Sequence, residues 1–173
     1  MNSLTDKYTL INSVEVPCIA FGTWKMPEEI AANAVKCAIE SGYRHIDTAA
    51  AYQNEEYVGK GIRESGVKRD EIFLVSKLPN DDHGYQNAID SCERSLKRLK
   101  TDYLDSYLIH WPVLVENVDR LEDDLCETWR AFEKLYNDGK LRSIGTSNFL
   151  EEHIEIIKRN FSTYPMINQV QMH

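Results

Sequence analysis

Short apolar runs alternate with amphipathic segments along most of the chain, and this alternation limits the folds that it can adopt. The runs cover residues 18–21, 45–46, 72–75, 107–109, 141–144 and 167–170. Their length and their content of β-branched and aromatic residues are typical of buried strands. The segments between them predict helices, so the sequence predicts six strands and five helices. A repeated strand–helix–strand order indicates right-handed βαβ units and a parallel sheet.

The segments at the amino-terminal end give the clearest local signals. Pro27 and the acidic residues after it favour the first turn of a helix, and Gly42 is a plausible residue for its end. Residues 8–16 predict a small hairpin that turns at Asn12-Ser13. We therefore expect a single domain over residues 1–173, with this hairpin in 1–17 and the parallel strands in 18–173.

Two architectures fit this order of elements. A doubly wound open sheet is natural for 173 residues, whereas a (β/α)8 barrel typically needs ~250 residues. Length favours the first. A dinucleotide-binding doubly wound sheet, however, would carry G-x-G-x-x-G after its first strand, and here that turn reads Gly22-Thr23-Trp24-Lys25.

Composition excludes several classes of function. The 28 acidic residues outnumber the 20 Lys and Arg, and a net charge of -8 disfavours non-specific nucleic-acid binding. No apolar run approaches the ~20 residues that cross a bilayer, and residues 1–6 do not resemble a signal peptide. We expect a cytoplasmic protein without a membrane or nucleic-acid partner. The scattered cysteines predict small core residues in a reducing compartment and no metal site: Cys18, Cys37, Cys92 and Cys126.

Polar residues stand where three successive predicted strands end. Asp47, Lys77 and His110 take these positions, and Tyr52 follows Asp47 by five residues. Each has an ordinary alternative: Asp47 could start a loop, Lys77 could reach out to water, and His110 could be a core histidine. In a parallel sheet, however, the carboxyl ends of the strands face the same way, so the side chains can converge on one pocket.

Together these four residues suit proton transfer during hydride transfer. A carbonyl that accepts hydride becomes an alkoxide and needs an acid nearby. The ordinary pKa of tyrosine is roughly 10, and we expect the ammonium of Lys77 to lower the pKa of Tyr52. Asp47 would supply the counter-charge for Lys77, and His110 could donate a hydrogen bond to the carbonyl oxygen. The hydride would come from a bound nicotinamide cofactor.

The sequence resembles the aldo-keto reductase family over nearly its whole length. The matching stretches are GTW (22–24), GYRHIDTA (42–49), YQNE (52–55), LVSK (74–77), DSYLIHWP (105–112), IGTSNF (144–149) and NQV (168–170). The resemblance implies a (β/α)8 barrel and the reduction of small-molecule aldehydes or ketones to alcohols. It also implies NADP(H) as the cofactor, although no residue of the chain distinguishes NADP from NAD.

The resemblance further implies roles for individual residues. Asp47, Tyr52, Lys77 and His110 would be the catalytic tetrad, with Tyr52 as the proton donor. Short polar side chains past strand ends suit an amide ligand, although Ser147 and Asn148 could instead cap a helix. Substrate would meet Trp24, His110 and Trp111, although either indole could be ordinary core packing. The cofactor contacts implied are Gly22, Thr23, Trp24, Asp47, Ser147, Asn148 and Gln169.

The chain differs from the family pattern in its length. The family has eight barrel strands, and the sequence predicts six. We therefore expect an incomplete barrel, namely the amino-terminal part of a longer enzyme, and little cofactor binding or reductase activity from the 173 residues alone. The alternatives are a catalytically incompetent fragment and a non-enzymatic cofactor-binding protein of the same fold. Substrate identity and oligomeric state stay open.

Overall fold

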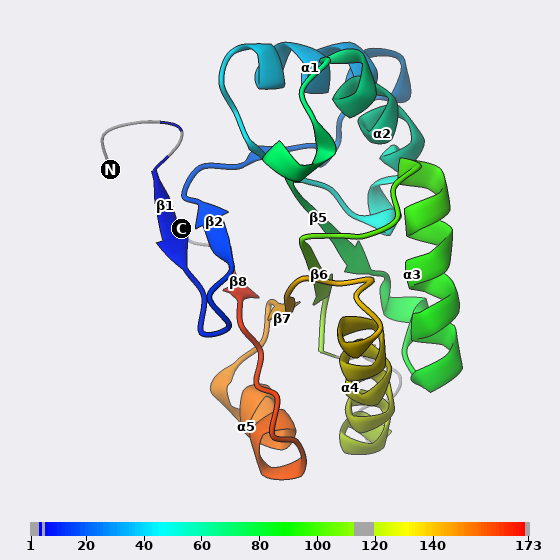
Figure 1. Ribbon diagram of the computed structural model, residues 1–173. Helices are drawn as coiled ribbons and strands as arrows, with labels where there is room; N and C mark the ends of the chain where they lie inside the picture. The colour runs from blue at the N-terminus through cyan, green and yellow to red at the C-terminus, as the bar shows by residue number, and fades with distance from the viewer. Residues whose placement is uncertain (1–3, 5, 113–119, 172–173) are drawn as a thin grey trace.

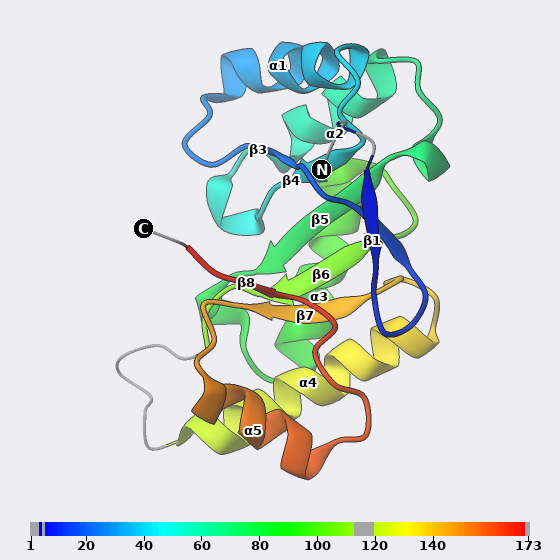
Figure 2. The ribbon, with the colours of Figure 1, turned by 90° about the vertical axis from the view of Figure 1, so that its left-hand side faces the viewer.

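Six strands form one parallel sheet whose spatial order follows the chain (Figure 2). The structure, a computed structural model, describes residue 4 and residues 6–112 and 120–171, so the predictions for residues 1–3, 5 and 172–173 lie outside it. The strands are β3 (Phe21–Gly22), β4 (His45–Asp47), β5 (Phe73–Leu78), β6 (Ser106–Ile109), β7 (Ile144–Ser147) and β8 (Asn168–Gln169). A doubly wound sheet reverses its strand order, and this one does not. The fold is therefore an incomplete (β/α)8 barrel, as predicted.

Helices lie between successive strands and cover the outer face of the curled sheet (Figure 1). Each packs against the next along the chain. Their apolar residues recur at spacings of three and four, and in the third helix Ala88, Cys92, Leu96 and Leu99 are all buried. The helices are α1 (Glu28–Glu40), α2 (Glu55–Glu64), α3 (Tyr85–Leu99), α4 (Leu121–Asn137) and α5 (Glu151–Asn160), with 3₁₀ turns η1 (Ala50–Tyr52), η2 (Arg69–Glu71) and η3 (Asn80–Asp82).

Strand boundaries differ from the predicted runs. The first parallel strand is Phe21–Gly22 rather than 18–21, and β5 continues to Leu78 rather than ending at 75. The run at 141–144 shares only Ile144 with its strand. Leu141 is buried but forms only an isolated bridge with Leu104. At Leu141 the apolar pattern reports burial without strand pairing, whereas Cys18 and Ala20 of the first run are exposed.

The sheet separates a large core from a small one. The large core lies between the sheet and the helices. On the inner face, Phe73, Val75 and Leu108 pack against Leu10 and Val16 of the amino-terminal hairpin, β1 (Lys7–Thr9) and β2 (Glu15–Pro17). The predicted hairpin is confirmed. Its strands run antiparallel, and they cover part of the inner face of the sheet (Figure 2).

The prediction for the cysteines is half wrong. Cys92 is buried and Cys126 is half-buried, whereas Cys18 and Cys37 are exposed. Cys37 lies on the solvent side of α1, whose buried face is Ala31, Val35, Ala38 and Ile39.

Within the described residues, no helix combines the length and apolar character that a bilayer crossing requires.

Candidate active site

The carboxyl ends of the parallel strands surround a cavity of about 610 Å³. Asp47 is the last residue of β4, Lys77 lies near the end of β5, and His110 directly follows β6. Tyr52 ends the 3₁₀ turn η1, which follows β4. The structure therefore brings together the four residues that the sequence predicts to converge on one pocket. The cavity is lined by Trp24, Ala51, Tyr52, Lys77, His110, Trp111, Ser147, Asn148, Gln169, Val170 and Gln171.

Lys77 is the central cation of the site. Its side chain is only 1% exposed, and its Nζ lies 2.5 Å from Asp47 Oδ1. The same ammonium donates to the Thr48 carbonyl oxygen at 3.0 Å and to the Tyr52 hydroxyl at 3.5 Å. Burial lowers the pKa of Lys77, and the adjacent Asp47 carboxylate opposes that shift. Lys77 thus links an anion to a phenol at the wall of the cavity.

Tyr52 has the opposite pKa shift from the one that we predicted. Burial, and to a smaller extent the charge of Asp47, raise the pKa of Tyr52 to about 12. The predicted direction of this pKa shift is therefore wrong in this structure. Burial of the phenol is the main reason, and Lys77 Nζ lies closer to the Asp47 carboxylate than to the phenol. Tyr52 is consequently protonated at neutral pH.

His110 lies edge-on to Tyr52, with ring centroids 5.7 Å apart and an interplanar angle of 76°. Burial, assisted by the charge of Lys77, lowers the pKa of His110 to about 4. The imidazole is therefore neutral at neutral pH and carries one N–H donor. The Asn148 side chain donates to the His110 carbonyl oxygen at 3.0 Å and fixes the backbone there.

Polar side chains from β7, β8 and the residue after β7 form one wall of the cavity. Ser147 Oγ donates to the Gln169 carbonyl oxygen at 3.0 Å, and Asn148 Nδ2 contacts Ser147 Oγ at 3.1 Å. Gln169 Nε2 reaches Asp47 Oδ2 at 3.3 Å and so joins the wall to the charged cluster. The alternative that Ser147 and Asn148 cap α5 is wrong, because the N-cap of that helix is Leu150.

The two indoles line the cavity rather than the core. Trp24 is 64% exposed and Trp111 is 48% exposed, so the alternative of ordinary core packing is wrong. A side chain at Gly22 would meet no atom within 4 Å, so the backbone there faces open space. Thr23 is fully buried, and its hydroxyl donates to the Thr48 hydroxyl at 2.9 Å. Its side chain therefore lies behind the cavity wall, not on it.

Sequence reasoning missed the residues that hold the turn of Tyr52 in place. Asn54 is fully buried; its Nδ2 donates to the carbonyl oxygens of Thr23 at 2.9 Å and Met26 at 3.1 Å, and its Oδ1 accepts from Thr48 at 3.2 Å. On the other side, Glu55 is 1% exposed and bonds to Ser76. Ser76 lies between Leu74 and Leu78 on the helix-covered face of its strand. A buried hydroxyl on that face favours a hydrogen-bond partner. That preference was visible in the sequence, whereas the identity of the partner was not.

The sequence model of the Aldo/keto reductase family matches residues 18–173 of the chain. The chain belongs to this family. The glyoxal reductase of Bacillus subtilis (strain 168) is 50% identical to it over 172 residues, which are 99% of this chain and 59% of that protein. The chain thus spans about three fifths of the length of this relative.

Solved structures show the same likeness. An aldo/keto reductase from Brucella melitensis superposes with a TM-score of 0.90 at 43% identity and covers 98% of this chain and 64% of its own. The aldo-keto reductase of Bombyx mori in complex with NADP superposes with a TM-score of 0.89 at 36% identity, covering 98% and 59%. Among the described residues, no group of three or more His, Cys, Asp or Glu is placed to hold a metal ion.

Proposed function

We propose that the protein carrying this chain is an NADP(H)-dependent oxidoreductase that reduces aldehydes or ketones to alcohols, with Tyr52 as the proton donor. The observation that carries the proposal is the contact of Tyr52 with Lys77 at 3.5 Å on the wall of a cavity. A structural lysine has no need of a phenol beside it. Membership of the family supports the class of reaction.

Tyr52 would protonate the carbonyl oxygen of the substrate. A pKa of about 12 keeps the phenol in its proton-donating form at neutral pH. As the proton leaves, the Lys77 ammonium stabilises the developing phenolate, and Asp47 holds that ammonium in place. The neutral His110 donates a hydrogen bond to the same substrate oxygen and orients it.

The cavity wall fits the carboxamide of a nicotinamide ring. A carboxamide needs both donors and acceptors, and Ser147, Asn148 and Gln169 offer hydroxyl and amide groups side by side. These three residues, with Asp47 and the backbone near Gly22, would hold the ring. When bound, the cofactor supplies the hydride. NADP(H) is the first cofactor to test because the Bombyx mori structure contains NADP.

The indoles of Trp24 and Trp111 would form the apolar sides of the substrate site. Carbonyl compounds with one small reactive end fit this arrangement of a polar floor and apolar sides. Glyoxal is a suitable first substrate because the Bacillus subtilis relative is a glyoxal reductase.

The test replaces Tyr52 by Phe and follows oxidation of NADPH with glyoxal and with an aromatic aldehyde. We expect kcat to fall by about a hundredfold or more, since general acid catalysis contributes on that scale. Affinity for NADPH should not change. Tyr164→Phe is the control, because this tyrosine is exposed and lies outside the cavity.

Full turnover by the Tyr52→Phe variant would overturn the role of Tyr52. Binding of NADPH without turnover of any carbonyl compound would instead indicate a non-enzymatic cofactor-binding protein. The same assay on residues 1–173 alone tests the expectation that these residues bind cofactor weakly and have little activity.

A further inference from the structure

A buried hydrogen bond joins the strand of Lys77 to the start of α2, just after the turn of Tyr52. Ser76 precedes Lys77 in β5, and its side chain is fully buried on the face toward the helices. Its hydroxyl donates to Glu55 Oε1 at 2.6 Å. Glu55 is the first residue of α2 and follows Tyr52 by three positions. The bond therefore runs behind the active-site wall, parallel to the contact of Lys77 with Tyr52.

Arg98 of α3 binds the second oxygen of the same carboxylate. Arg98 Nε lies 2.7 Å and its Nη2 lies 2.5 Å from Glu55 Oε2. Arg98 is itself held by Ser95, whose Oγ accepts from Nη2 at 3.1 Å. A buried carboxylate bonded at both oxygens cannot rotate without breaking a strong, charge-assisted bond. Glu55 thus gives Ser76 a fixed partner.

The backbone between Tyr52 and Glu55 transmits this constraint. Gln53 adopts a left-handed conformation with φ of 59°, which reverses the chain at that point. Tyr52 therefore faces the cavity, while Asn54 and Glu55 turn into the packed interior. Asn54 ties the turn to the loop after β3, and Glu55 ties it to β5. Only the second connection reaches the strand that carries Lys77.

We propose that Ser76 and Glu55 are positioning residues whose hydrogen bond sets the separation between the Tyr52 hydroxyl and Lys77. This inference rests on the proposed function, in which Lys77 stabilises the phenolate of Tyr52. The contact of 3.5 Å is already at the long limit of a hydrogen bond. A small displacement of β5 against the turn would therefore break this hydrogen bond and weaken the stabilisation of the phenolate.

The experiment compares Ser76→Ala with Ser106→Ala in the whole protein that carries these residues. Ser106 is an equally buried serine on the neighbouring strand, and its Oγ has no hydrogen-bond partner in the described structure. We expect Ser76→Ala to lower kcat about tenfold or more, because small misplacements of catalytic groups have large effects. KM and NADPH affinity should stay unchanged. Ser106→Ala should leave all three values unchanged.

Two further variants separate positioning from general loss of structure. Ser76→Thr keeps the hydroxyl and should restore most of the rate. Because both residues act through one bond, the double variant Ser76→Ala/Glu55→Gln should cost little more than the larger single change. Thermal unfolding of each variant identifies any rate loss that comes from unfolding.

A second readout does not depend on turnover. Carbon-13 labelling of the tyrosine Cζ atoms gives one NMR signal per tyrosine, and Tyr52→Phe assigns the signal of Tyr52. This signal should move or broaden in Ser76→Ala and stay in place in Ser106→Ala.

The two readouts distinguish failure of this inference from failure of the proposed function. An unchanged rate and an unchanged Tyr52 signal in Ser76→Ala would overturn the inference alone. A moved signal with an unchanged rate, in a protein whose Tyr52→Phe variant is still active, would overturn the proposed role of Tyr52 while supporting the positioning bond.

Discussion

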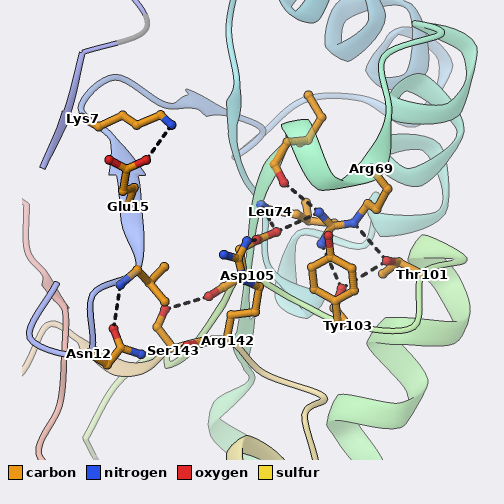
Figure 3. Close-up of polar contacts among 12 residues, drawn as sticks. Lys7, Asn12, Glu15, Arg69, Leu74, Thr101, Tyr103, Asp105, Arg142 and Ser143 are labelled. Atoms are coloured by element: carbon orange, nitrogen blue, oxygen red, sulfur yellow. Dashed lines mark hydrogen bonds and ion pairs between the residues drawn. The ribbon is translucent and has the colours of Figure 1, made fainter. Parts of the chain in front are cut away.

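Each end of the sheet contains one buried charged side chain, and the two side chains differ in the groups that they contact. At the carboxyl end, Lys77 is shared among Asp47, the Thr48 carbonyl oxygen and the Tyr52 hydroxyl. At the amino end, Asp105 is equally buried and accepts from Arg69 at 2.8 Å and Arg142 at 2.7 Å (Figure 3). It also accepts from the Leu74 backbone N–H at 3.0 Å.

The difference lies in the partners. Asp105 has strong donors on both oxygens, and its bonds tie η2, β5 and the segment before β7 together. Lys77 instead faces a cavity and contacts a group that can give up a proton. A cavity of about 670 Å³ also lies at the amino end, but Arg142 and Asp105 on its wall already bond each other. Size therefore does not identify the active site, whereas reactive partners do. We expect changes at the carboxyl end to alter rate and changes at the amino end to alter stability.

The largest effect should come from Lys77→Met. The variant removes the ammonium that we propose stabilises the Tyr52 phenolate, so kcat should fall by roughly a hundredfold or more. The free energy of unfolding should fall less than in Asp105→Ala, because Asp47 stays partly exposed and keeps Gln169 as a donor. Steady-state kinetics and urea unfolding measure both quantities, with the exposed Lys97→Met as control. Loss of stability with an unchanged kcat would show that Lys77 has a structural role, contrary to the expected difference between the two ends of the sheet.

Asp105→Ala should give the largest loss of stability. Its removal leaves two guanidinium groups and the Leu74 N–H without their acceptor, at a cost of about 3–5 kcal/mol. The rate per folded molecule should not change, because Asp105 lies at the opposite end of the strands. Urea unfolding measures the loss, and active-site titration normalises the rate. A stable variant with a low kcat would refute this assignment.

The two arginines that bind Asp105 should differ. Arg69 also donates to the Ile72 and Tyr103 carbonyl oxygens and to Thr101, whereas Arg142 is half exposed. Arg69→Met should cost about 2–3 kcal/mol, since buried carbonyls lose their donors. Arg142→Met should cost less than about 1 kcal/mol, as for an exposed ion pair. Equal costs in urea unfolding would show that the extra bonds of Arg69 contribute nothing.

The smallest effect should be a pH dependence of stability at the carboxyl end. The folded protein holds the pKa of His110 at about 4, below the ordinary 6.5 that applies to the unfolded chain. As pH falls from 6.5 to 4, the unfolded state therefore binds the proton first, and stability decreases over that interval. Urea midpoints at neutral and mildly acidic pH should differ less in His110→Gln. The slope should not vanish, because burial also lowers the pKa of His45 and His83.

The sequence predicted the order of strands and helices better than it predicted which side chains contact each other. Alternation of apolar runs located the strands because each run alternates with an amphipathic helix, and the strand ends then placed Asp47, Lys77 and His110 on one side. Strand boundaries were less predictable, since Leu141 is buried without belonging to a strand. The pKa of Tyr52 was predicted in the wrong direction because burial of the phenol, which the sequence does not show, raises it most.

Contacts between distant segments were the least accessible from sequence. Ser76 with Glu55, and Asp105 with Arg69, are pairs of polar residues that each have several possible partners. Burial makes a hydrogen-bond partner energetically favourable, but only the packing of helices against the sheet selects it.

The agreement between strand order and chain order has a consequence for synthesis. Each parallel strand pairs with the one made just before it, so the sheet can grow as the chain leaves the ribosome. Asp47, Tyr52 and Lys77 are all present once β5 is complete, whereas Ser147 and Gln169 emerge much later. The bond from Gln169 to Asp47 spans 122 positions and joins these two parts. The residues of β4, η1 and β5 that we propose for proton transfer are thus made early, and the wall proposed for the nicotinamide is made last.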